Sequence, residues 1–155
     1  MATEIPVTHT DRPRVPWWHW LVGVLGVLWS LGGAYDYLMT QTRNADYLAR
    51  IPDPLMEHFL AMPTWLEAFW AIAVWGGLAG WVLVLLRSRF AVPLFLASLV
   101  AMVINFGWSL VDGGLALQAE HMGAAAAYGF TGLIVAGAVF ALWYARRMRA
   151  RGVLR

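Results

Sequence analysis

Four long runs of apolar residues, separated by short polar connections, dominate the pattern along the chain. They cover about residues 17–38, 64–86, 91–112 and 123–145. With a helical rise of about 1.5 Å per residue, runs of this length extend roughly 33 Å, enough to cross the hydrocarbon core of a bilayer. The pattern predicts an all-α membrane protein in which residues 1–155 form one transmembrane domain, a four-helix antiparallel bundle.

A cleaved signal peptide is the competing interpretation of the first run. Such a peptide has an apolar core of about 7–15 residues that ends at a small-residue cleavage site. The run 17–38 is longer, is rich in Trp and ends in Tyr35-Asp36-Tyr37. We therefore interpret it as a retained membrane anchor that follows a polar tail at 1–16.

Two polar connections contain further helical signals. Asp53 fits the N-cap of a helix and Pro54 its first helical position. This pair predicts a short helix over about 54–61 along the membrane surface. Thr64 and Glu67 have the spacing of a capping box at the start of the second span. Residues 115–122 fit either a loop or an early extension of the last span.

Composition agrees with a membrane protein, since 61% of the 155 residues are hydrophobic and 13% are charged. A soluble domain carries charge on about a quarter of its residues, so too few charges are present here for a water-facing surface. The chain has no Cys, which excludes disulfides, thiolate metal sites and cysteine nucleophiles. Its eleven basic residues are all Arg, which together with abundant Ala and Gly indicates a GC-rich bacterial genome.

The arginines are distributed unequally among the connections. Only Arg43 and Arg50 lie on one side of the four spans. The others lie in the two tails and the second connection: Arg12, Arg14, Arg87, Arg89, Arg146, Arg147, Arg149, Arg151 and Arg155. The positive-inside rule then predicts a multi-pass protein of the bacterial inner (cytoplasmic) membrane with both ends in the cytoplasm. The same placement favours topology over nucleic-acid binding as the reason for a pI near 9.4.

Two patterns within the spans concern packing. In the third span, Ser98, Asn105 and Asp112 recur every seven residues and so lie nearly on one face, which should turn toward the bundle, a partner subunit or a water-filled cavity. Small residues at three- and four-residue steps let helix backbones approach one another. These predicted seams are Gly23, Gly26, Ser30 and Gly33 in the first span, Gly76 and Gly80 in the second, and Gly132 and Ala136 in the fourth.

Polar residues near the outer ends of the spans form a candidate ligand-binding site, a shallow pocket open to the outer side. Its members are Asp36, Glu67, Asn105, Asp112 and Tyr128. Carboxylates beside amide and aromatic groups suit hydroxyl-rich or cationic ligands, and a carboxylate of raised pKa can exchange protons during transport. The structural alternatives are a capping residue at Glu67, a hydrogen bond from Asn105 to a neighbouring helix, and interfacial carboxylates at Asp36 and Asp112.

Catalysis and metal binding have less support. Methionine and histidine on the outer side suit copper by softness, namely Met39, Met56, His58, Met62, His121 and Met122. They form no dense HxH or MxxM cluster, and His19 lies at the opposite membrane edge, which disfavours a bis-histidine haem. No hydrolase, zinc-protease or nucleotide-binding motif occurs. We predict no catalytic residues, no metal site and no cofactor.

Several segments carry a resemblance: Gly33–Gln41, Asn44, Tyr47, Pro63–Trp65, Val74–Gly77 and Leu85–Pro93. In these segments, and over about residues 17–110, the chain resembles a small uncharacterised bacterial family of four-transmembrane-helix proteins. Some members of that family are loosely labelled "sugar transporter". The resemblance implies a compact four-span inner-membrane protein and carries over no catalytic or binding residues.

The leading hypothesis is a non-enzymatic inner-membrane protein that acts as an accessory or oligomeric subunit. Its partners are the lipid bilayer and either further copies of the chain or a larger membrane complex. The alternative is a small-solute transporter, with a sugar as one candidate solute, which works as an oligomer through the outer polar pocket. A membrane enzyme ranks third.

Overall fold

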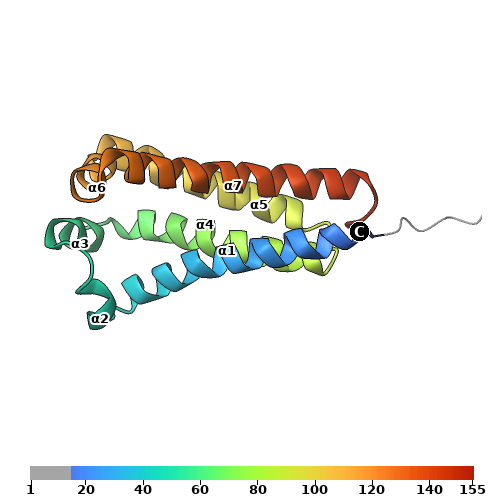
Figure 1. Cartoon of the computed structure of the whole chain (residues 1–155), viewed down its shortest axis with the longest axis horizontal. Coiled ribbons are helices and arrows are strands. Elements are labelled where there is room, and N and C mark those ends of the chain that lie inside the picture. Colours follow the sequence, from blue (N-terminus) through green and yellow to red (C-terminus); the bar gives the residue numbers. More distant parts are fainter. Residues whose placement is uncertain (1–14) are drawn as a thin grey trace, which may run out of the picture.

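The computed structural model describes residues 15–155, which form seven α-helices and no strand (Figure 1). Four of these helices are long and apolar enough to cross a membrane: α1 (Trp17–Gln41), α4 (Thr64–Leu85), α5 (Ala91–Val111) and α7 (Ala124–Ala150). The predicted all-α membrane fold with four spans is therefore confirmed. Most of the polar tail predicted at 1–16, with Arg12 and Arg14, lies outside the described residues.

Three short helices lie together at one end of the molecule, and the chain's last residue lies at the other end (Figure 1). These helices are α2 (Ala45–Leu48), α3 (Asp53–Leu60) and α6 (Gly114–Met122). The expected surface helix at 54–61 corresponds to α3, whereas α2 was not predicted. The expected N-cap is wrong, because Pro52 is the N-cap and Asp53 lies inside the first turn without a capping hydrogen bond. The segment 115–122 is a separate helix rather than a loop or an extension of α7. Gly123 ends it with φ 86° and ψ 139°, a conformation that glycine adopts readily and other residues do not.

The capping prediction for the second span is wrong. Helix α4 begins at Thr64 as expected, but its N-cap is Pro63 and no side chain caps it. Pro63, at φ −61° and ψ 139°, is in the extended conformation of an N-cap residue. Glu67 therefore lies in the first turn of α4, where a carboxylate interacts favourably with the positive end of the helix dipole.

Charges are segregated between the two ends of the helices. What we call the acidic end carries all the carboxylates of residues 15–155: Asp36, Asp46, Asp53, Glu57, Glu67, Asp112 and Glu120. Arg43 and Arg50 also lie there. What we call the arginine end carries Arg87, Arg89, Arg146, Arg147, Arg149, Arg151 and Arg155, and no described Asp or Glu. The arginine end is therefore strongly basic.

The long helices pack in the order α1, α4, α5, α7. Helix α4 makes its most extensive contact with α5, and α1 packs mainly on α4. The distance between α1 and α7 increases toward the end where α2 lies (Figure 1). The fold is therefore open on one side toward the acidic end, where the first and last spans lie apart. Near mid-span they still approach each other, since a Cβ added at Gly137 would lie 3.9 Å from Nε1 of Trp29.

Glycines in α4 allow its close contact with α5. A Cβ atom added at Gly76 would lie 3.2 Å from the Cβ of Ser98, and one at Gly80 would lie 2.5 Å from a ring carbon of Phe95. The Ser98 hydroxyl donates a hydrogen bond of 2.6 Å to the carbonyl oxygen of Ala73, which joins the two helices directly. The predicted seam at Gly76 and Gly80 is confirmed.

The other predicted seams have mixed outcomes. In α1, Gly23 packs against Leu85 and Gly26 against Trp81. By contrast, a Cβ added at Gly33 or at Gly132 would meet no atom within 4 Å. The prediction that Gly33 and Gly132 line seams within this chain is wrong, because both lie on helix faces turned away from the other spans. In α1 it is the next residue, Ala34, that is buried.

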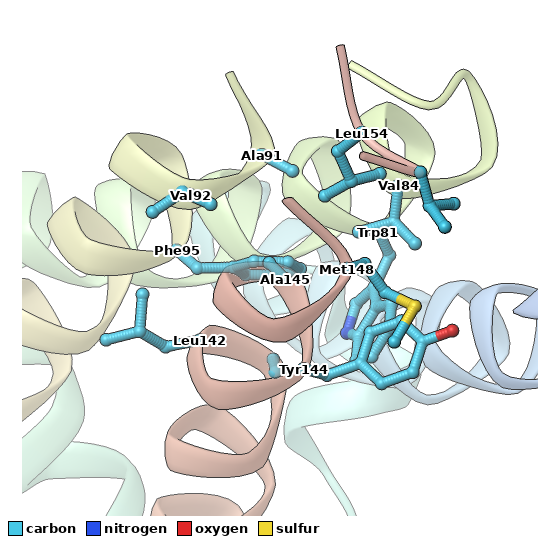
Figure 2. Packing of buried hydrophobic residues seen from close by; sticks show 12 residues of the cluster. Trp81, Val84, Ala91, Val92, Phe95, Leu142, Tyr144, Ala145, Met148 and Leu154 are labelled. Carbon is cyan, nitrogen blue, oxygen red and sulfur yellow. The ribbon is translucent and has the colours of Figure 1, made fainter. Parts of the chain in front are cut away.

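The largest buried cluster lies toward the arginine end, where α4, α5 and α7 meet (Figure 2). The last residues of the chain complete this cluster, since Val153 and Leu154 are buried. Arg155 pairs with the turn between α4 and α5: its N–H donates to the carbonyl oxygen of Arg87, and its carbonyl oxygen accepts from the N–H of Arg89, both at 2.8 Å. The end of the chain thereby holds α7 against that turn.

Candidate functional site

Asp36 connects α1 to α2. Its carboxylate accepts a hydrogen bond from the hydroxyl of Tyr47. Helix α2 is itself capped by Asn44, whose side-chain oxygen accepts from the N–H of Tyr47 at 3.0 Å. Burial, and then the hydrogen bond to Asp36, raise the pKa of Tyr47, so its hydroxyl stays protonated and keeps donating at neutral pH. Asp36 has a structural partner in this arrangement.

Asp112 joins α3 to the connection between α5 and α6. One carboxylate oxygen accepts from the N–H of Gly114 at 3.0 Å, and the other lies 3.4 Å from Nε2 of His58. The site is tightly packed, because a Cβ added at Gly114 would lie 2.5 Å from that nitrogen. The side chains of Asp112 and His58 are 24% and 29% exposed, so this pair stays open to solvent.

The polar face predicted for the third span does not act as one unit. Ser98 binds α4, Asp112 binds α3, and the Asn105 amide donates at 3.2 Å to the carbonyl oxygen of Ala101 in its own helix. The expected hydrogen bond from Asn105 to a neighbouring helix is therefore not formed within residues 15–155. A side chain that bonds to its own helix can be satisfied without a partner helix.

The two remaining candidates, Glu67 and Tyr128, take part in none of these contacts. Glu67 is half-buried in the first turn of α4, and Tyr128 is 51% exposed on α7. Among the described residues, no hydrogen bond or ion pair joins any two of Asp36, Glu67, Asn105, Asp112 and Tyr128. A shared pocket for these five residues stays a prediction.

The best-defined polar site lies at the arginine end and was not predicted. His19 is fully buried, and Nε2 donates at 3.1 Å to the carbonyl oxygen of Val84. Because a carbonyl only accepts, the neutral ring leaves Nδ1 to accept from the hydroxyl of Tyr144 at 2.9 Å. These two bonds connect α1, α4 and α7. A histidine near the start of the first apolar run and a tyrosine near the end of the last were the only signals in the sequence.

A groove adjoins this junction, between the start of α1 and the end of α7. It has a volume of about 330 Å³. Its walls include aromatic side chains from both helices, and two arginines lie on its α7 side: Trp18, Phe140, Trp143, Tyr144, Arg147 and Arg151. The ring of Trp18 meets that of Tyr144 edge-on, with 6.1 Å between centroids. The groove therefore combines apolar walls with two cations.

No protein-family model, curated protein or solved structure matches this chain. Its function must therefore follow from its own residues. Three features stand out: the buried junction of His19 and Tyr144, the cationic groove beside it, and the apolar helix faces that no residue of 15–155 covers.

Proposed function

We propose that this protein is a non-enzymatic subunit of a membrane assembly and packs laterally through α7 against a second membrane-spanning chain. One observation carries the proposal: small residues line the face of α7 that points away from the bundle. A Cβ added at Gly129 or at Gly132 would meet no atom within 4 Å. Ala125 and Ala136, which lie on the same face, are exposed as well.

The spacing of these residues matches a helix–helix contact surface. The positions 125, 129, 132 and 136 follow steps of four, three and four, which place them on one face of an α-helix. The buried face of α7, with Ala127, Ala141 and Ala145, lies on the opposite side. In a bilayer, apolar burial does not drive helices together, whereas small residues let two backbones come into van der Waals contact.

The cost of the glycines supports the same proposal. In a helix interior, glycine is about 0.8–1.0 kcal/mol less favourable than alanine. Gly129 and Gly132 therefore weaken α7, and no contact within the described chain compensates for them. A neighbouring helix packed on this face would compensate, because only glycine allows the closest approach of two backbones.

The proposed setting is the inner membrane of a bacterium, with the arginine end in the cytoplasm. The charge segregation supports this orientation, since arginines accumulate on the cytoplasmic side of membrane proteins. At that end the described residues include seven arginines and no Asp or Glu. Both the start of α1 and the end of α7 then face the cytoplasm.

A small-solute transporter that works as an oligomer is the second candidate. It is favoured by the divergence of α1 from α7 toward the acidic end, where Asp36 and Asp112 lie (Figure 1). Four helices that are open on one side do not enclose a pathway across the membrane. A second chain packed on the open side would be needed to close it.

The assembly is tested by native mass spectrometry of the full-length protein, extracted gently from its own membrane. We expect a second copy or a defined partner protein to remain bound to the wild-type chain. Gly132→Leu should abolish this association, because a leucine side chain separates the two backbones. The matched control is Gly107→Leu in α5, where an added Cβ also meets nothing within 4 Å.

The control variant should retain the associated chain. A wild-type protein that is always monomeric, or equal behaviour of the Gly132 and Gly107 variants, would contradict the proposal. A bound solute in an oligomer that survives Gly132→Leu would favour the transporter instead.

A further inference from the structure

The groove between α1 and α7 combines apolar walls with positively charged side chains. Trp18 on α1 and Phe140 and Trp143 on α7 contribute apolar surface. Tyr144 also lines the groove, but its hydroxyl is committed to His19. In Figure 2, Tyr144 and Met148 both point toward the side of α7 where α1 lies. An occupant would therefore meet an apolar surface in the groove and cations on one side of it.

Two arginines supply the charge. Arg147 and Arg151 are one helical turn apart on the same side of α7 and are exposed. Within residues 15–155, neither forms a salt bridge, and no Asp or Glu side chain lies at the arginine end to neutralise them. Guanidinium groups bind phosphate oxygens through paired N–H donors. The pair is thus arranged to bind a phosphate group.

The groove lies near the end of the membrane spans, and this position indicates which class of molecule would carry the phosphate group. Trp143 is 54% exposed and Trp17 is 74% exposed, at the ends of spans, and tryptophan prefers the interface between lipid tails and headgroups. Basic pockets between transmembrane helices at this depth suit the headgroups of anionic lipids. A free phosphate ion would leave the apolar walls of the groove without a partner.

We infer that this groove binds one anionic phospholipid, with its phosphate on Arg147 and Arg151 and the start of an acyl chain against Trp18 and Phe140. None of the small residues at 125, 129, 132 and 136 that carry the proposed assembly lines this groove. It adds a lipid ligand on the α1 side of the molecule. Its test does not depend on whether the protein has a protein partner.

The experiment is a titration of the purified full-length protein with phosphatidylglycerol, followed by native mass spectrometry. We expect one lipid to bind more tightly than the rest, and phosphatidylcholine to bind more weakly. Arg147→Gln combined with Arg151→Gln should weaken this binding about 30-fold, because each arginine near an anionic lipid contributes about 1 kcal/mol.

The control variant is Arg146→Gln combined with Arg149→Gln, which removes the same charge from residues of α7 that do not line the groove. It should retain the tight lipid, and far-ultraviolet circular dichroism checks that both variants keep their helices. The proposal is overturned if the two double variants lose binding equally or if phosphatidylcholine binds as tightly as phosphatidylglycerol. Displacement of the lipid by millimolar inorganic phosphate would identify a free-anion site and also overturn it.

Discussion

At the scale of single residues, His19 is a polar group in an apolar surrounding whose two ring nitrogens both have partners. Its contacts reach Val84 in α4 and Tyr144 in α7. Burying a polar group without a hydrogen bond costs about 1–3 kcal/mol in proteins, so such a group stabilises a fold only when it is paired. Here the pairing defines how α1 meets the end of α7.

We predict that His19→Leu lowers the free energy of unfolding by about 2–4 kcal/mol, because it removes both hydrogen bonds of the ring and leaves the Tyr144 hydroxyl unpaired. The Val84 carbonyl oxygen keeps its bond from the N–H of Arg87. Tyr144→Phe removes only one of the two bonds and should cost about 1 kcal/mol. Chemical denaturation in detergent micelles, followed by circular dichroism, measures both. Equal losses in the two variants would contradict the assigned hydrogen-bond network.

At the scale of helices, the contact between α4 and α5 is the most extensive in the fold, and glycines in α4 allow the two helices to approach each other. Phe95 is 3% exposed, and its ring lies over Gly80. A buried ring cannot move into solvent to make room. The separation of α4 and α5 therefore depends on the absence of a side chain at Gly80.

Gly80→Ala should lower the free energy of unfolding by about 1–3 kcal/mol, the usual cost of overpacking a core. Gly107→Ala in α5 adds the same methyl group where nothing lies within 4 Å. It should instead raise the stability by up to about 1 kcal/mol, because alanine favours helix more than glycine does. Thermal unfolding in micelles compares the two, and a gain in both variants would argue against the tight contact.

Sequence reasoning was most successful at this scale, where a pattern repeats within one helix. Four spans follow from length and apolar content, and α3 from an Asp-Pro start. The break between α6 and α7 did not follow, because a glycine such as Gly123 does not reveal the sign of its φ angle. Nor did the contact of His19 with Tyr144, which are 125 residues apart. Spacing alone identified the small residues around Gly132 but not whether they face the bundle.

At the scale of the whole molecule, the two ends differ in charge and in packing. The arginine end contains the buried cluster, the docked chain end and the cationic groove. At the acidic end α1 and α7 lie apart, and polar contacts such as that between Asp36 and Tyr47 connect the helices. Lateral assembly would cover the faces that this open arrangement leaves bare.

The orientation of the molecule can be measured directly, because the chain has no cysteine. Ala49 lies exposed at the acidic end and Ala150 at the arginine end. In intact cells with a permeable outer membrane, a membrane-impermeant maleimide should label Ala49→Cys, and should label Ala150→Cys only after the inner membrane is lysed. The reverse pattern would place the arginine end outside.

The charge segregation has a consequence in an energised membrane. A bacterial cell maintains a potential that is negative inside, and moving one elementary charge across 100 mV changes its energy by about 2.3 kcal/mol. In the proposed orientation, turning the protein over would carry arginines outward and carboxylates inward, both against the field. The total is roughly 20–30 kcal/mol by the same measure. A membrane potential maintained by respiration would then favour this orientation over the inverted one.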